Sequence, residues 1–462
     1  MKENAPVAPN PYEPPATSPP GDVKSAIVDH RQLPPLMRDG SFWGLTLTQF
    51  LGAFNDNLFK QLVLLLAVSF VSSSTAGDNQ DVAAIVFALP FVLFSGFAGY
   101  LSDRYSKRNI TVWAKVAEIA IMLLGVAGFL LYGTTGYVGL LVVLFLMGAQ
   151  SAFFGPSKYG ILPELFRGTD LPRANGIIIM TTFLAIIFGT VAAGVLRDLL
   201  VERTAEGAMD ATRLWIGSLA CVGIAVVGTL TSAIIRPTPR AVPDLAFRLS
   251  SLAIPPETRA VLRRDLPLVQ AILASSMFWM VSGVTVLVVN YVGTHEMGFD
   301  AAESGTPTSA LSACLAIGIM VGAVIAGKLS RGKVDFRLTR VGAFGIVVCL
   351  TMLGLFSDGR QLLGFGLSIP TMVMLGTFAA FFAIPVQVFI QARPTEDQKG
   401  RVIAVMNLAN FTAILFSGAI YGVFDRFVRA VELPHSPIFI MTGLIILPVA
   451  LFYRPRSIEL SA

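Results

Sequence analysis

Charge is what this sequence has least of. Only 14% of its 462 residues are Asp, Glu, Lys or Arg, whereas a soluble globular domain carries about 25%. Hydrophobic residues make up 54% of the chain, and the mean hydropathy is +0.70. This amount of charge is too small to cover a water-facing surface of this size. Much of the surface must therefore face lipid. This excludes the series of about three soluble domains that the length alone would suggest.

Cysteine and histidine are also scarce. The chain has three of each, which are Cys221, Cys314, Cys349, His30, His295 and His435. Each cysteine stands alone in an apolar run without C-x-x-C spacing, which predicts packing residues and neither a metal site nor a disulfide framework. The histidines lie outside the apolar runs, so we expect no buried histidine relay. The sequence indicates no metal and no cofactor.

The basic residues form no single patch. The sequence pI is about 9.1, but the lysines and arginines are spread over short loops, so we expect no nucleic-acid partner. No apolar segment follows Lys2, so no signal peptide is expected. Residues 1–40 are polar and rich in proline, which predicts a disordered arm on the cytoplasmic side.

What the chain does have is long apolar runs, and a spanning helix needs about 20 apolar residues. Twelve runs meet this need, at roughly 42–71, 82–101, 110–132, 137–154, 173–196, 213–235, 266–292, 306–327, 338–357, 361–391, 401–425 and 436–453. The tenth run is too long for one span and contains Pro370 and Pro385, so a tilt, a kink or an early exit is expected.

The distribution of positive charge orients these spans. With both termini in the cytoplasm, 26 of the 34 lysines and arginines lie on the cytoplasmic side, 6 on the other side, and Lys60 and Lys115 inside spans. Positive residues are retained on the cytoplasmic side of a membrane. We therefore predict a multi-pass protein of the inner membrane with both termini inside.

The chain divides into two halves at its longest loop, residues 236–265. This predicts an all-α membrane protein with a six-helix bundle at 41–235, a cytoplasmic linker, a second six-helix bundle at 266–453 and a tail at 454–462. The halves resemble each other, since Gly99-Tyr100-Leu101-Ser102 after the second run recurs as Gly327-Lys328-Leu329-Ser330 after the eighth. Repeated halves are typical of secondary transporters, whose substrate site lies between them near the midplane.

Residues 99–108 resemble the loop signature of the major facilitator superfamily. They contain Gly99, Leu101, the pair Asp103-Arg104 and the pair Lys107-Arg108, with Ser106 where that family usually has glycine. The resemblance implies the twelve-helix fold of that family, and it implies that Asp103 contacts the facing half near Arg401 and stabilises one conformation. A solvated loop is the alternative. The candidate gating residues are Gly99, Asp103, Arg104, Lys107, Arg108, Lys158, Glu164 and Arg401.

Two further segments, Gly52–Lys60 and Gly155–Leu165, look like the lysophospholipid transporter branch of that superfamily. The resemblance implies a monomeric transporter, not an enzyme, that moves lysophospholipids such as lysophosphatidylethanolamine across the bilayer for reacylation. Some relatives carry this domain fused to an acyltransferase and an acyl-carrier-protein synthetase, so a separate acyltransferase is an expected partner. Within the second segment, Lys158–Leu165 is amphipathic and is predicted either to lie at the membrane surface or to act as a gate.

Ionisable residues inside spans mark candidate sites, because each costs about 2.5–3.5 kcal/mol to insert. Asp56 and Lys60 are four residues apart, and Lys115 and Glu118 are three apart. They indicate either a substrate or coupling site or two self-neutralising pairs, and Lys115 has the further option of extending to the membrane surface. With polar neighbours and two C-terminal asparagines, the candidates are Gln49, Asn55, Asp56, Asn57, Lys60, Lys115, Glu118, Asn407 and Asn410.

The spans of the second half hold no central charge. Their asparagines can bind substrate or form hydrogen bonds between helices. A cavity charged on one side and apolar on the other suits an amphiphile. The alternatives are a proton-coupled exporter of drugs or small solutes, and an acyltransferase or membrane scaffold. His295 and Asp300 have the H-x-x-x-x-D spacing of glycerolipid acyltransferases, but the loop at 293–305 is too short for such a fold.

Overall fold

The computed structural model describes residues 33–69, 79–167, 170–203, 209–210, 212–240, 256–300, 303–330, 333–334, 336–394, 396–453 and 458–459. The predicted disordered arm lies almost entirely outside the described residues. So do most of the predicted tail and residues 241–255 of the predicted linker.

Twelve long helices account for the twelve apolar runs in the described part of the chain. In the N-terminal half they are α1 Gly40–Ser69, α2 Gln80–Arg104, α3 Lys107–Leu130, α4 Tyr132–Gly160, α6 Leu171–Leu200 and α7 Trp215–Ala233. In the C-terminal half they are α9 Leu266–His295, α10 Gly305–Ser330, α11 Phe336–Leu353, α12 Gly364–Ala392, α13 Glu396–Ala430 and α14 Pro437–Phe452. Eleven are long and apolar enough to cross a membrane, and α14 is a shorter apolar helix. The predicted all-α membrane fold is confirmed.

The remaining elements are short. They are the helical turns η1 Leu36–Arg38 and η3 Thr212–Leu214, the helices α5 Leu162–Leu165 and α8 Pro256–Arg264, and the antiparallel strand pairs β1 Glu202–Arg203 with β2 Met209–Asp210, β3 Lys333–Val334 with β6 Ile458–Glu459, and β4 Phe356–Ser357 with β5 Arg360–Gln361. The predicted linker thus contains the helix α8. In α12 the chain neither exits early nor breaks, because the helix continues through Pro370 and Pro385.

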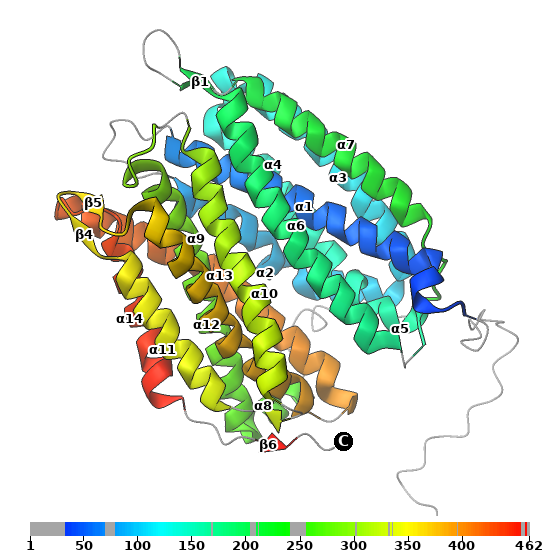
Figure 1. Cartoon of the computed structure of the whole chain (residues 1–462). Helices are drawn as coiled ribbons and strands as arrows, with labels where there is room; N and C mark the ends of the chain where they lie inside the picture. Colours follow the sequence, from blue (N-terminus) through cyan, green and yellow to red (C-terminus); the bar gives the residue numbers. More distant parts are fainter. Residues whose placement is uncertain are drawn as a thin grey trace, which may run out of the picture.

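The helices pack as two bundles (Figure 1). In the N-terminal half α1 lies against α6 and α7, and α4 against α2 and α3; in the C-terminal half α9 packs on α13, and α12 on α10 and α11. The end of the molecule where Arg104, Lys107, Arg236, Arg263 and Arg393 lie is called the basic end below. The hairpins β1–β2 and β4–β5 lie at the opposite end.

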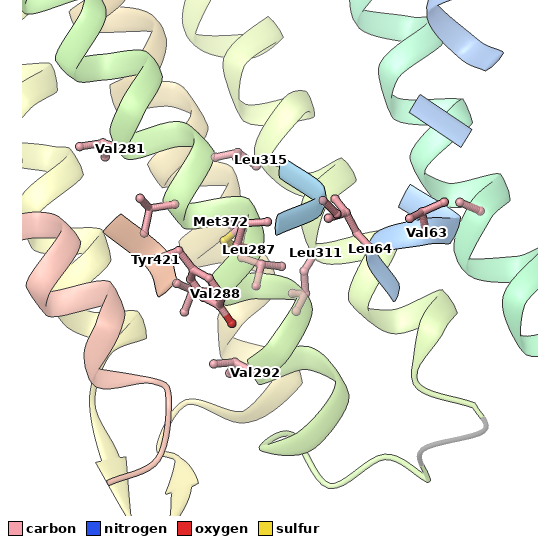
Figure 2. Close-up of a cluster of buried hydrophobic side chains, with 14 of the residues drawn as sticks. Val63, Leu64, Val281, Leu287, Val288, Val292, Leu311, Leu315, Met372 and Tyr421 are labelled. Atoms are coloured by element: carbon pink, nitrogen blue, oxygen red, sulfur yellow. The ribbon is translucent and has the colours of Figure 1, made fainter. Parts of the chain in front are cut away.

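The two halves meet at the opposite end and diverge toward α5 and α8 at the basic end (Figure 1). Contacts between the halves join α6 to α10, α2 to α13 and α1 to α9. Figure 2 shows the apolar part of this contact, where Leu64 of α1 lies beside Leu311 of α10 and Leu287 of α9. Burying these side chains from water and lipid closes the opposite end.

Glycines allow close approaches between the helices. A Cβ at Gly318 of α10 would lie 2.1 Å from the carbonyl oxygen of Val373 in α12, and one at Gly322 would lie 2.5 Å from that of Thr377. Gly418 allows α13 to approach α2 of the other half equally closely, because a Cβ at this position would lie 2.7 Å from the carbonyl oxygen of Asp81. No larger residue fits these positions without movement of the backbone.

We expect Gly318→Ala to destabilise the protein by about 1–3 kcal/mol, because the added methyl group must push α10 away from α12. The apparent melting temperature of the purified protein in detergent measures this. Gly366→Ala in α12 is the matched control, since no atom lies within 4 Å of its Cβ position. Equal melting temperatures for the two variants would contradict the close approach.

Candidate functional site

Three consecutive side chains of α1 point to three different neighbours. Successive residues of a helix differ by about 100° in direction. Asn55 therefore faces α3 and α7, and Asp56 faces α4. Asn57 accepts from Lys60 and faces α6, where its Cβ lies 3.3 Å from the Cβ position of Gly189. The segment that carries the family resemblance is thus the meeting point of several helices of the N-terminal half.

Lys115 and Glu118 form an ion pair that is sealed inside the N-terminal half. Their side chains are 1% and 2% exposed. Asn55 donates from Nδ2 to Glu118 Oε1 at 2.8 Å and to the carbonyl oxygen of Cys221 at 3.2 Å. A Cβ at Gly52 would lie 2.7 Å from Lys115 Nζ, so α1 approaches the pair as closely as its backbone allows. Lys115 does not extend to the membrane surface, and the pair ties α1, α3 and α7 together.

Asp56 and Lys60 do not pair in the same way. The Ser151 hydroxyl of α4 donates to Asp56 Oδ2 at 2.6 Å. Lys60 Nζ donates to Asn57 Oδ1 at 3.2 Å and lies 5.2 Å from the centre of the Phe87 ring. Among the residues that the structure describes, no ion pair joins Asp56 to Lys60 or to any other cation. Of the two ion pairs that the alternative interpretation requires, only the one between Lys115 and Glu118 is present among the described residues.

A chain of polar groups connects α1 to α6 and to the C-terminal part of α4. Gln49 is fully buried, donates from Nε2 to Thr181 Oγ1 at 2.6 Å and accepts from Thr182 Oγ1 at 2.7 Å. Lys158 Nζ donates to the same Thr182 hydroxyl at 3.2 Å, and its side chain is buried. Asp56 and Lys115 are both close enough to act electrostatically on Lys158. Lys158, predicted as a gating residue, therefore lies with the polar groups of the predicted binding site.

The segment after Lys158 packs into the N-terminal bundle, and its place at the membrane surface or in a gate stays a prediction. Ile161, Leu162 and Leu165 are buried in an apolar cluster with residues of α1, α6 and the start of the chain's described part. Glu164 pairs with Lys107 at the first turn of α3. This ion pair joins α5 to α3, so the segment is part of the N-terminal bundle at its basic end.

The signature residues after α2 lie at the same end. Arg104 donates to the Tyr100 hydroxyl and its guanidinium lies 5.6 Å from the centre of the Tyr105 ring. Arg108 donates to the carbonyl oxygens of Ala233 and Ile235, both at 3.3 Å, and so satisfies the open end of α7. The side chain of Asp103 lies outside the described residues, and its contact near Arg401 stays a prediction. Gly99 has no atom within 4 Å of its Cβ position.

The two C-terminal asparagines differ in their surroundings. Asn410 is buried and its Oδ1 accepts from the hydroxyls of Ser275 and Ser276, at 3.1 and 3.2 Å. It therefore joins α13 to α9. Asn407 is exposed on α13. The interhelical interpretation describes Asn410, whereas Asn407 is accessible to a ligand.

Hydrogen bonds between the halves were not foreseen from the sequence. Gln61 of α1 donates to Asn290 Oδ1 of α9 at 2.8 Å, and Asn290 donates in turn to Gln80 Oε1 of α2 at 3.0 Å. All three side chains are buried. Uncharged amides in apolar runs carry little sequence signal.

A second connection between the halves involves charge. Asp198 at the end of α6 accepts from the backbone N–H groups of Gly305 and Thr306, at 2.8 and 2.6 Å, and so caps the first turn of α10. Arg197, which is 1% exposed, lies 2.9 Å from Asp198 Oδ1 and donates to the Ser304 hydroxyl. We call these residues, together with Gly305 and Thr306, the α6–α10 latch. In the sequence they look like ordinary loop charges.

His435 is buried, although it lies outside the apolar runs. Its Nε2 is 2.7 Å from Asp425 Oδ1, and Arg429 Nε donates to the same oxygen at 2.8 Å. Glu296 accepts from the Ser436 hydroxyl and from the backbone N–H of His435. Burial raises the pKa of the Glu296 carboxyl, and these hydrogen bonds act in the opposite direction. The cluster joins α9, α13 and α14 at the opposite end.

Two bundles of helices long and apolar enough to span a membrane, joined by contacts at one end, form the architecture of a membrane transporter. The sequence profile of the Major Facilitator Superfamily matches residues 45–418. The chain belongs to this superfamily.

Relatives and solved structures agree with this assignment. The chain is 31% identical over 386 residues to the lysophospholipid transporter LplT of Enterobacter sp. (strain 638), which covers 82% of this chain and 87% of the relative. It is equally similar to LplT of Escherichia coli O7:K1, with 81% and 86% covered. The fold resembles the inward-open xylose transporter XylE, with a TM-score of 0.64, 14% identity and coverage of 89% and 95%. A POT family transporter in complex with 5-aminolevulinic acid gives 0.65, with 12% identity and the same coverage.

The Lys115–Glu118 pair predicts a specific pattern of stability. Removing one partner leaves a charge buried alone and costs about 3–5 kcal/mol, whereas replacing both by apolar or neutral groups is often near neutral. We therefore expect Lys115→Met and Glu118→Gln each to lower the apparent melting temperature more than the double variant does. Additive effects of the two substitutions would show that the pair does not stabilise the helix contact in this way.

Proposed function

We propose that the protein moves lysophospholipids, such as lysophosphatidylethanolamine, across the inner membrane by alternating access of its two halves. One observation carries the proposal. Asp56 holds a carboxylate inside a spanning helix with only a hydroxyl as its close partner, one helical turn from the Lys60 ammonium group. Two opposite charges that do not neutralise each other are matched by a zwitterionic head group.

The chemistry of that head group fits the order of the two residues. Residues four apart on a helix are about 6 Å apart along its axis, so Asp56 and Lys60 can contact two ends of one head group. Asp56 binds the ammonium group, and Lys60, with the amide of Asn57 beside it, binds the phosphate. Lys60 lies nearer the opposite end and Asp56 nearer the basic end, so the ammonium group points toward the basic end.

The acyl chain lies along aromatic and apolar side chains that flank this polar region. Phe91 of α2 and Phe411 of α13 are stacked with their ring centres 4.3 Å apart, which joins the halves through an apolar contact. Phe278 and Trp279 of α9 lie edge to face at 5.7 Å, and Trp279 is 42% exposed. Hydrocarbon against such surfaces is favoured at about 25 cal/mol per Å². The polar side chain Asn407 is exposed on the same half.

We place the basic end in the cytoplasm, because short loops rich in lysine and arginine stay there. Both termini are then cytoplasmic. The halves contact each other at the opposite end through the α6–α10 latch and the Gln61–Asn290–Gln80 hydrogen bonds. The conformation described here is therefore closed to the outside and open to the cytoplasm, the state from which a lysophospholipid would be released for reacylation.

A separate acyltransferase would consume that product, since transport by this chain involves no catalysis. The transporter works as a monomer. Removal of the product by acylation would draw more lipid inward without another energy source. Proton-coupled export of a small solute remains the competing function, with Asp56 as the proton-binding group. Direct measurement of lipid transport separates the two.

We expect Asp56→Asn to reduce uptake of labelled lysophosphatidylethanolamine into proteoliposomes at least tenfold, because a hydrogen bond to a charged group contributes about 1.5–3 kcal/mol. Asp358→Asn is the matched control, since Asp358 is exposed in the β4–β5 hairpin at the opposite end. If Asp56→Asn, normally inserted, transported at the wild-type rate, the head-group assignment would fail. No uptake by well-inserted wild-type protein would reject the substrate and favour the exporter.

The α6–α10 latch predicts a shift in the conformational equilibrium. Asp198→Ala removes the cap on α10, which contributes about 1 kcal/mol, so the outward-open population should rise about fivefold. Spin labels at Val138→Cys and Asp358→Cys, in a background without the native cysteines, report the separation of the halves at the opposite end. Glu432→Gln, an exposed charge change at that end, is the control. Identical distance distributions for Asp198→Ala and the control would show that the latch does not hold the halves.

A further inference from the structure

A groove on the outer surface of the C-terminal half lies far from the polar residues of α1. It has a volume of about 510 Å³ and is formed by α11 and α12. Arg337 and Arg340 lie at one end of it, and apolar residues line the rest. No part of the proposed transport site contributes to this groove.

The residues of α11 that line the groove form one stripe. Arg337, Arg340, Phe344 and Val348 follow each other at steps of three or four residues, so they share a face of the helix. Phe344 and Val348 are exposed, and so is Val341 beside them. The stripe begins with two exposed arginines at the basic end and continues as an apolar surface toward the middle of the bilayer.

The floor and one wall of the groove depend on a single glycine. A Cβ at Gly345 would lie 2.2 Å from Cγ of Phe378 in α12, so the Phe378 ring lies directly on the α11 backbone. The ring of Phe378 lines one side of the groove. A larger residue at position 345 would displace the ring and change the shape of the groove.

The length of the groove matches one leaflet of a bilayer. Residues 337 and 348 are eleven positions apart, which corresponds to about 16 Å along a helix. The hydrocarbon core of a bilayer is about 30 Å thick. A chain that fills the groove from the arginines to Val348 therefore reaches the centre of the membrane and no further.

The two arginines lie where a helix favours an anion. They occupy the first two turns of α11. The N-terminus of a helix carries a partial positive charge, so cations there are disfavoured and a bound anion is favoured. Arginine is also the side chain best suited to bind phosphate through two parallel hydrogen bonds.

We propose that this groove binds an anionic phospholipid of the leaflet at the basic end. Arg337 and Arg340 bind its phosphate, and one acyl chain lies over Val341, Phe344 and Val348 against the ring of Phe378. Anionic lipids are enriched in the cytoplasmic leaflet and bind in basic pockets between spanning helices. The bound lipid fills the groove between α11 and α12 and stabilises the C-terminal half. It is a resident ligand and not the transported molecule.

Native mass spectrometry and thermal unfolding of the whole delipidated protein test this proposal. The probes are phosphatidylglycerol, phosphatidylcholine and inorganic phosphate. We expect phosphatidylglycerol to bind the wild type and raise its apparent melting temperature more than phosphatidylcholine does. The double variant Arg337→Gln/Arg340→Gln should bind phosphatidylglycerol at least tenfold more weakly, because charge-assisted hydrogen bonds are lost. Arg263→Gln/Arg264→Gln, which removes two exposed arginines of α8 at the same end, should bind it like the wild type.

A second variant tests the apolar part of the groove without changing its charge. Position 348 is exposed, so the variant Val348→Trp should fold. Its tryptophan side chain would fill the groove, so the variant should lose bound phosphatidylglycerol although both arginines are present. Equal binding of phosphatidylglycerol to the wild type and the arginine variant would overturn the proposal. So would equal stabilisation by the two lipids, or full stabilisation by inorganic phosphate, which would indicate an anion site without an acyl chain.

Discussion

Inside a bilayer, water is not available to satisfy a polar group, and this constraint determines how the rest of the structure is arranged. Every backbone N–H and C=O must find its partner within the protein, which is why the apolar runs form continuous helices. The same rule governs the side chains. The Lys115–Glu118 pair and Asn55 provide one another with partners, and Gly52 lets α1 approach them. Packing of α1, α3 and α7 depends on this buried group.

The constraint also explains why the remaining charges are informative. Asp56 accepts a hydrogen bond from a hydroxyl and Lys60 donates one to an amide, and the function proposed above assigns both to head-group binding. A buried charge without a close counterion is expensive, and proteins retain it where it binds or carries something. The difference between the sealed pair and the open residues could not be inferred from their spacing. It comes from the packing of α1 against its neighbours, which places Glu118 beside Lys115 and Ser151 beside Asp56.

Contacts between the halves have a different character from contacts within them. They include amide hydrogen bonds, a capped helix end, an apolar cluster and the ion pair between Asp81 and the exposed Arg426 at the opposite end. When the halves separate at that end, amides, backbone N–H groups and the Asp198 carboxylate can bind water instead, which offsets the lost hydrogen bonds, whereas the apolar cluster becomes exposed. A buried ion pair in the same place would be costly to break. The seam is therefore suited to repeated opening. The groove on α11 faces the lipid, where the bilayer itself supplies the ligand.

The sequence by itself determined the class of fold, because the thickness of the bilayer sets the length of each apolar run and every run became one helix. It also determined the family, through the residues of helix α1 and of the loop after α2, and it identified Asp56 and Lys60 as charges inside a span. Only the tertiary structure decided which charges pair. The spacing of Asp56 and Lys60 suggested an ion pair, but Ser151 of α4 contacts the carboxylate instead. His435 and Asp198 looked like loop residues and proved to join helices. The physical reason is that helical periodicity specifies which side chains share a face, whereas the packing of the helices decides which residues that face meets.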